Sequence, residues 1–179
     1  MYPETDIPPI KITKELLKKA EMGESLEEKK QKLLKLLGSP EMAHNMLRSR
    51  NLQLFERLID QGANPMLAAT TLENTLISLR REGIEIRNVD EVLPDVFALF
   101  EKKKIVKSAI PDILKEVAKG KIVGEVAKEY SIITGIELRK IVDSLNNDIK
   151  AIMSKYRTRI DPEELHKALK KQEIEKKLK

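Results

Sequence analysis

The segment GANPMLAATTLENTLISLRREG, residues 62–83, decides the fold class of this chain. Asn64 suits a helix N-cap, and Pro65 suits the first helical position, where a backbone N–H would have no partner anyway. Gly83 is typical of the position just after a helix. The apolar residues between these ends recur at helical spacing, namely Leu67, Ala68, Leu72, Leu76 and Leu79. We therefore predict one long helix from Pro65 to Arg81.

The residues before this segment predict shorter helices with readable ends. Ser25 and Glu28 have the spacing of a capping box, in which each residue binds the backbone N–H of the other. Gly38 is typical of a helix stop, and Gly62 ends the last of these helices. The predicted helices begin near Thr13, Ser25, Ser39 and Leu52.

Further helices follow the central segment. We predict one over 89–100 and another that Ser108 caps, with Pro111 in its first turn and Gly120 as its stop. A shorter helix covers 122–130. The β-branched stretch Ile132–Gly135 is interpreted as a linker and a candidate hinge.

The end of the chain predicts a helical hairpin. A single apolar stripe at helical period continues from Leu138 to Tyr156. Thr158 and Arg159 fall in the turn, and Asp161-Pro162 is a strong start for the second helix. Since no useful strand alternation occurs, the chain is predicted to be all-α. We expect an extended segment over 1–10, a helical domain over 11–131 and a small tail bundle over 136–179.

Charge is concentrated at the end of the sequence. The net charge is +5, and residues 136–179 carry twelve Lys and Arg against eight Asp and Glu. Basic charge on one small domain favours a polyanionic partner. The alternative is a lysine-rich helix surface that is merely solvated.

Composition also excludes several kinds of site. The sequence has no cysteine, which excludes disulfides and thiolate metal sites and fits a reducing, cytoplasmic setting. No apolar run approaches the roughly 18 residues that span a bilayer. Only two histidines occur, His44 and His166, on different predicted helices, so no metal site is expected. We find no phosphate-binding loop and predict no catalytic residue.

Two stretches resemble a known family. YPETDIPP, residues 2–9, resembles the segment that ends the catalytic cradle of the GatB/GatE family of tRNA-dependent amidotransferase subunits. The Gly62–Ala69 turn and the helix after it are similar to the helical domain of that family, and 105–121 fits its next capped helix. The terminal bundle resembles its YqeY-like tail. Within the family, the archaeal-type GatE proteins are the most similar.

The resemblance implies a function. Such enzymes amidate Glu-tRNA(Gln) to Gln-tRNA(Gln), using ATP and magnesium in the cradle. This chain would then be a cytoplasmic, non-catalytic C-terminal fragment that binds tRNA(Gln), with 1–10 as a remnant of the cradle and a GatD-type glutaminase as the partner of the full-length protein. The tail is expected to contact tRNA phosphates through Lys155, Arg157, Arg159, Lys167, Lys170 and Lys171. The alternative is a protein-interaction module that docks on amidotransferase or synthetase partners.

Overall fold

The computed structural model describes the backbone of residues 11–19, 24–145 and 147–177, and the side chains of 11–16, 24–145 and 147–170. Within these ranges the regular secondary structure is entirely helical, which confirms the all-α prediction. The predicted extended segment 1–10 lies outside the described residues. The helices of the first half are α1 (Lys14–Lys19), α2 (Leu26–Leu37), α3 (Pro40–Arg48), α4 (Leu52–Asp60), α5 (Pro65–Thr70), η1 (Thr71–Thr75) and α6 (Leu76–Arg81). Those of the second half are α7 (Val89–Glu101), η2 (Lys107–Ala109), α8 (Ile110–Ala118), α9 (Val123–Glu129), α10 (Gly135–Ser144), α11 (Ile149–Tyr156) and α12 (Pro162–Lys177).

Local capping explains where several helices begin. The Ser25 hydroxyl accepts a hydrogen bond from the Glu28 backbone N–H, and the Glu28 carboxylate accepts one from the Ser25 N–H. At the start of α5, the Asn64 side-chain oxygen accepts from the Leu67 N–H at 3.0 Å. These side chains satisfy N–H groups that have no partner within the helix. The caps predicted at Ser25, Ser39 and Asn64 are thereby confirmed.

The long helix predicted from Pro65 to Arg81 is present, but it is not uniform. Its middle, Thr71–Thr75, is a π-helix, in which the Leu76 N–H donates to the Thr71 carbonyl five residues earlier. The Thr71 hydroxyl donates a buried hydrogen bond to the Leu67 carbonyl at 2.8 Å. Such π segments often mark functional positions, because they displace side chains from regular helical register.

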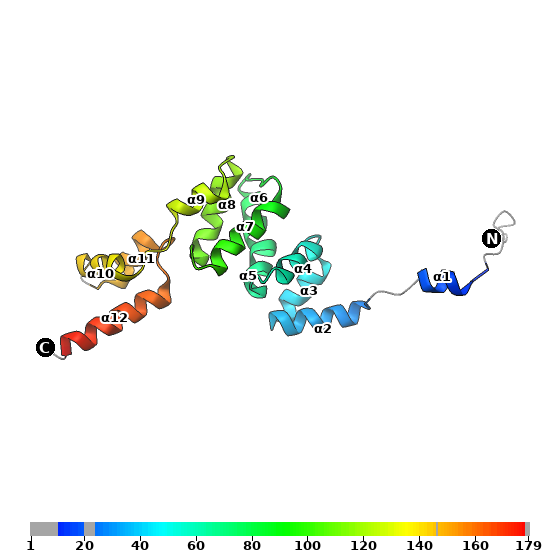
Figure 1. Cartoon of the computed structure of the whole chain (residues 1–179), viewed down its shortest axis with the longest axis horizontal. Coiled ribbons are helices and arrows are strands. Elements are labelled where there is room, and N and C mark those ends of the chain that lie inside the picture. The colour runs from blue at the N-terminus through cyan, green and yellow to red at the C-terminus, as the bar shows by residue number, and fades with distance from the viewer. Residues whose placement is uncertain (1–10, 20–23, 146, 178–179) are drawn as a thin grey trace.

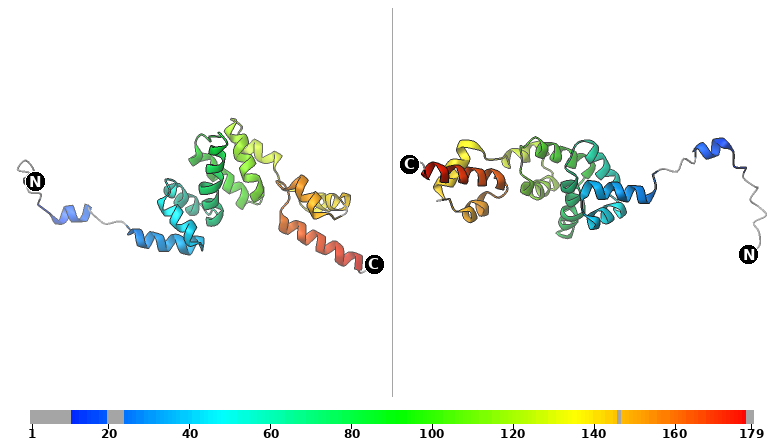
Figure 2. Two further views of the ribbon diagram at one scale, coloured as in Figure 1. Left: turned by 180° about the vertical axis from the view of Figure 1, so that it is seen from behind. Right: turned by 90° about the horizontal axis from the view of Figure 1, so that it is seen from below.

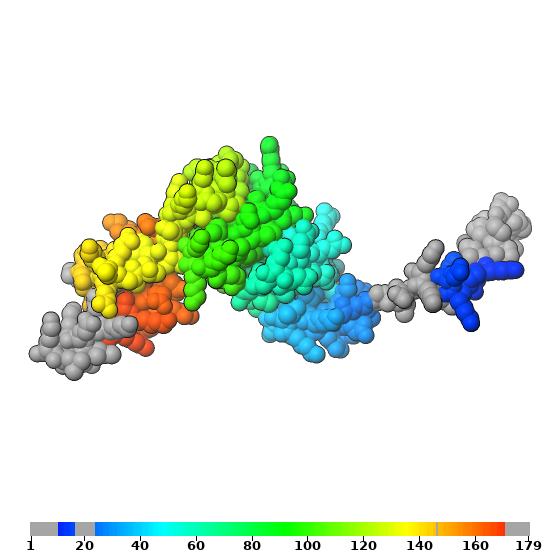
Figure 3. Space-filling view, in the orientation of Figure 1, coloured from blue at the N-terminus to red at the C-terminus, as the bar shows by residue number. Residues whose placement is uncertain are grey.

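Helices α2 to α9 enclose the larger of two hydrophobic cores (Figure 1). Its fully buried members come from helices far apart in sequence, and they include Met46, Phe55, Leu58, Leu72, Leu93, Phe97, Ile110 and Leu114. Each such side chain contributes about 1.5–3 kcal/mol relative to an exposed position. Helix α1 lies away from this body in every view (Figures 1, 2 and 3). Leu16 on this helix and Ile12 just before it are exposed.

The predicted helical hairpin at the end of the chain was wrong in one respect, because its first arm is two helices. The apolar stripe does not form one helix, because the chain turns between α10 and α11, where Asn147 adopts a left-handed φ of 59°. Asp148 then caps α11 by accepting from the Lys150 and Ala151 N–H groups. The tail is therefore a bundle of α10, α11 and α12 around a separate core of Ile133, Leu138, Val142, Ile152, Ile160, Leu165 and Leu169. The division into domains at 131 and 136 stays a prediction.

Candidate functional site

The turn between α11 and α12 lies where the two cores meet. The Ser108 hydroxyl donates a 2.6 Å hydrogen bond to the carbonyl of Arg157 in this turn. The Ile133 N–H donates to the carbonyl of Arg159 at 2.8 Å, and the Ile132 N–H donates to the carbonyl of Lys104 at 3.1 Å. These bonds join the turn to both cores. We call the region formed by Lys104, Ser108, Ile132, Ile133 and the Arg157–Arg159 turn the junction.

One prediction about the junction was wrong, and a second remains open. Ser108 does not cap α8, because it lies within the short helix η2 and donates its hydroxyl proton to Arg157 instead. The predicted linker over Ile132–Gly135 is a loop as far as Thr134, and its role as a hinge stays a prediction. Ile133 is buried in the smaller core, and its N–H and that of Ile132 are both hydrogen-bonded across the junction. Gly135 already belongs to α10.

The three basic residues predicted around the turn have different surroundings. Lys155 is exposed in the last turn of α11, with its ammonium 5.6 Å from the ring centroid of Tyr156. Arg157 is also exposed, and no hydrogen bond or ion pair is found for its guanidinium within the described residues. Arg159 is half-buried, and its Nε donates to the carbonyl of Ser131 at 3.3 Å. Part of the hydrogen-bonding capacity of Arg159 is therefore already used.

The predicted lysines of α12 are further from the junction. Lys167 pairs with Glu164 at 2.9 Å, and this hydrogen bond raises the pKa of the Lys167 ammonium. Lys170 is exposed and lies about 12 Å beyond Pro162 along the helix axis. The side chain of Lys171 is outside the described residues. The structure thus brings Lys155, Arg157 and Arg159 together at one turn, while Lys167 and Lys170 continue the charge along α12.

The sequence did not indicate that two exposed lysines beside the larger core, Lys104 and Lys107, would border the junction. Lys104 accepts a hydrogen bond there through its carbonyl, and Lys107 directly precedes Ser108. Both side chains are exposed. The run Lys102–Lys104 was visible in the sequence, but nothing local indicates that it lies near a turn about fifty residues later.

A cleft of about 610 Å³ opens between the two cores at the junction. The apolar residues that line it include Leu67, Phe100, Val106, Ile110, Pro111 and Met153. Lys107, Arg157, Asp161 and Glu163 provide two positive and two negative charges on its walls. Thr71 and Thr75 at the two ends of the π-helix line it as well, so the irregular turn faces this cleft. We call it the junction cleft.

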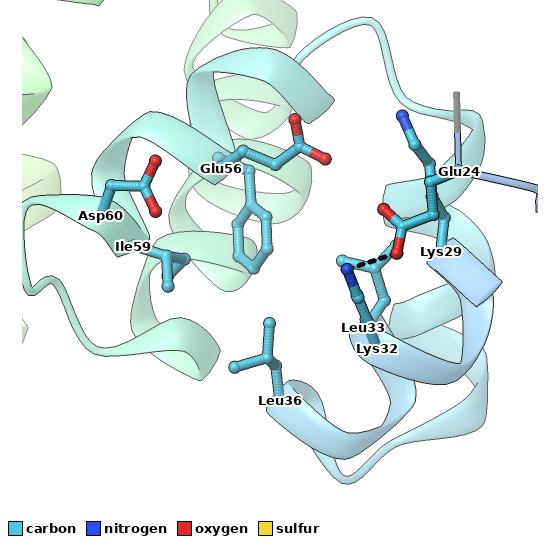
Figure 4. Close-up of a pocket in the computed structure, with 9 residues that line it drawn as sticks. Glu24, Lys29, Lys32, Leu33, Leu36, Glu56, Ile59 and Asp60 are labelled. Atoms are coloured by element: carbon cyan, nitrogen blue, oxygen red, sulfur yellow. Dashed lines mark ion pairs between the residues drawn. The ribbon is translucent and has the colours of Figure 1, made fainter. Parts of the chain in front are cut away.

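A second groove, of about 520 Å³, lies between α2 and α4 (Figure 4). Leu36 points across it toward the helix that carries Glu56, Ile59 and Asp60 (Figure 4). On the α2 side of the groove, Lys32 forms an ion pair with Glu24. This arrangement of apolar and charged side chains provides a surface but no set of groups arranged for catalysis.

Other functional groups are dispersed. His44 and His166 are both exposed, on α3 and α12. In the part of the chain that the structure describes, no three residues among His, Asp and Glu are grouped to hold a metal ion. None of the described helices is long and apolar enough to cross a membrane.

Comparisons with known proteins agree with this architecture. A family model described as the GatB domain matches residues 53–169, which include most of the larger core and the whole of the smaller core. The E subunit of glutamyl-tRNA(Gln) amidotransferase from Pyrobaculum calidifontis is 38% identical over 181 residues, covering 94% of this chain and 29% of the relative. The protein of the same name from Pyrococcus furiosus is 39% identical over 155 residues, covering 82% and 24%. The chain therefore spans less than a third of the length of these curated relatives.

Proposed function

The chain belongs to the GatB domain family, and we propose that it binds tRNA for an amidotransferase that converts Glu-tRNA(Gln) to Gln-tRNA(Gln). In this proposal the tail and the junction hold the body of the mischarged tRNA. The name of the relatives, which are E subunits of a glutamyl-tRNA(Gln) amidotransferase, supports the choice of tRNA(Gln).

The observation that carries the proposal is the set of exposed cations that are available to a polyanion. Lys155, Arg157 and Lys170 are exposed, and no ion pair with a described acidic residue is found for them. Cations on a protein surface attract RNA phosphates and release the counterions condensed on them. Folded RNA is recognised largely through its shape and backbone, for which charges on a rigid helical surface are well suited.

The chemistry is assigned to parts of the relatives beyond the matched region. In this proposal ATP and magnesium bind there. A GatD-type glutaminase would be the protein partner of the whole enzyme. The cytoplasm, where tRNA is aminoacylated, would be its location.

A binding measurement tests the proposal. We expect the chain to bind a tRNA(Gln) transcript with an affinity that falls steeply between about 50 and 200 mM salt, because several phosphate contacts would be lost together. Replacing Lys155, Arg157 and Lys170 together by Gln is expected to flatten this dependence. Lys128 is exposed on α9 and does not line the junction cleft, so Lys128→Gln is the matched control. Binding that is undetectable, or that the triple variant leaves unchanged, would overturn the proposal.

The second candidate is a protein-docking module. The groove between α2 and α4 favours it, because Leu36 and Ile59 line an open surface there. The test is whether the chain captures a purified GatD-type glutaminase. Docking is favoured over RNA binding if the wild type captures this protein, the Ile59→Glu variant does not, and no RNA binding is detected.

A further inference from the structure

The junction cleft has features that contact with an RNA backbone alone does not require. Its volume of about 610 Å³ lies within the range of about 300–1,000 Å³ that small-ligand sites occupy. Its lining includes several apolar side chains, among them the half-buried Phe100. A surface that contacts only phosphates needs neither a hollow nor an aromatic side chain.

Four charged residues are among those that line the cleft. Lys107 is the neighbour of Ser108, whose hydroxyl is 2.6 Å from the carbonyl of Arg157. This short hydrogen bond therefore joins the backbone of Arg157 to the residue next to Lys107, and both cations line the cleft. Neither has an ion-pair partner among the acidic side chains of the described residues, so both can bind a phosphate group.

The acidic side chains limit the kinds of ligand that fit. Asp161 uses one carboxylate oxygen to accept from the Glu163 N–H, which caps α12. The carboxylate of Glu163 lines the cleft and can accept hydrogen bonds from a hydroxyl or an amino group. Two carboxylates beside two cations disfavour a ligand with many charges. They suit a ligand with one phosphate, hydrogen-bond donors and a flat apolar part.

We propose that the junction cleft holds one unstacked nucleotide of the bound RNA, with its base against Phe100 and its phosphate between Lys107 and Arg157. Proteins that recognise folded RNA commonly take up single splayed bases, which stack on aromatic side chains and form hydrogen bonds through their edges. The inference rests on the proposed function. It adds that both cores contribute to one site and that the tail is held at the angle that forms it.

The π-helix supports the inference independently. Thr71 and Thr75 mark the ends of this irregular turn, and both line the cleft. A π segment in a long helix is rare and is often found at a functional position. The Thr71 hydroxyl is buried and donates to the Leu67 carbonyl, so the half-buried Thr75 is the residue of this turn that is placed to meet a ribose hydroxyl or a phosphate oxygen.

The test compares variants of the full chain in binding a tRNA(Gln) transcript. Phe100→Leu keeps an apolar side chain but removes the ring, and it should weaken binding about tenfold, the effect of one lost stacking contact. Lys107→Gln changes an exposed residue and should weaken binding several-fold without altering thermal stability. Lys128→Gln, the matched control, should have no comparable effect. A transcript containing 4-thiouridine should cross-link to peptides that include Phe100 or Met153, and the cross-link should disappear in Phe100→Leu.

The outcomes separate this inference from the proposed function. If RNA binds but both cleft variants bind like the wild type and no cross-link reaches the cleft, the inference is overturned and the proposed function stands. If no RNA binds at any salt concentration, both fail. Adding AMP distinguishes a free nucleotide from an RNA nucleotide. AMP binding that requires Phe100 and Lys107, with RNA affinity unchanged in the variants, would overturn the assignment to RNA.

Discussion

The hydroxyl of Ser108 lies 2.6 Å from the backbone carbonyl of Arg157, although the two residues are 49 positions apart in the sequence. Ser108 belongs to the larger core's side of the junction, and Arg157 to the turn between α11 and α12. This hydrogen bond and that from the Ile133 N–H to the carbonyl of Arg159 hold the turn against both cores. The orientation of the tail therefore depends on contacts made by the same turn that carries its exposed cations.

Ser108→Ala should loosen the junction. Loss of one hydrogen bond is expected to lower the free energy of unfolding by about 1 kcal/mol, measured by urea denaturation. Hydrogen exchange at the Ile133 amide should become faster, because the bond it makes to the neighbouring turn is less well held. Ser154→Ala, at an exposed serine of α11, is the matched control. Equal stability and exchange in the two variants would contradict this account of the junction.

The two lysines of α12 should differ in their importance for RNA binding. Lys167 is paired with Glu164, whereas Lys170 is exposed and has no ion pair with a described residue. Lys170→Gln should reduce the slope of log affinity against log salt by about 0.7–0.9, the effect of one phosphate contact. Lys167→Gln should reduce it by less, because RNA would have to displace Glu164. The reverse order of effects would show that the ion pair does not persist in the complex.

Substitutions of Asn147 should change stability according to how well the new residue tolerates a left-handed φ. Its φ of 59° is left-handed, a conformation that asparagine tolerates and that glycine adopts without strain. We expect Asn147→Ala to lower the free energy of unfolding by about 1 kcal/mol and Asn147→Gly to leave it nearly unchanged. Urea denaturation of both variants measures the difference. Equal effects would argue that α10 and α11 join as one helix in solution.

The boundary between α5 and the π-helix offers a matched pair of threonines, Thr70 and Thr71. The Thr71 hydroxyl is buried and donates to the Leu67 carbonyl, whereas the more exposed Thr70 hydroxyl donates to the Met66 carbonyl. Thr71→Val should destabilise the chain by about 1 kcal/mol through loss of a buried hydrogen bond. Thr70→Val should cost less, since water can replace the lost partner. Thermal unfolding of the two variants provides the comparison, and the prediction fails if Thr70→Val costs as much.

Glu116 should link stability to pH. Hydrogen bonds from the Lys119 and Lys121 ammonium groups lower the pKa of its carboxyl from 4.5 to about 2. A group with a depressed folded-state pKa contributes stability above its unfolded pKa and loses that contribution as pH falls through the folded value. The difference in Tm between the wild type and Glu116→Gln should therefore be constant above about pH 5 and shrink between about pH 4.5 and pH 2. A carboxyl titration by NMR with a midpoint near 4.5 would contradict the depressed pKa.

The sequence by itself determined the helical class and many helix ends. Ser25 with Glu28, Ser39 with Pro40 and Asn64 with Pro65 act within one turn of chain, so their positions in the sequence suffice to predict them. The family was also readable from local motifs, and the match to residues 53–169 confirms it.

Only the tertiary structure decided what the locally ambiguous residues do. Ser108 has the sequence context of a cap, but the carbonyl of Arg157 is the acceptor that folding brings within 2.6 Å. The stripe from Leu138 to Tyr156 has one helical period, yet the small core is closed by a turn at Asn147 that lets α10 and α12 pack together. The junction cleft unites Phe100, Lys107 and Arg157, which no short-range pattern connects. Local hydrogen bonding fixes helix ends, whereas the packing of distant apolar faces fixes which polar groups meet between them.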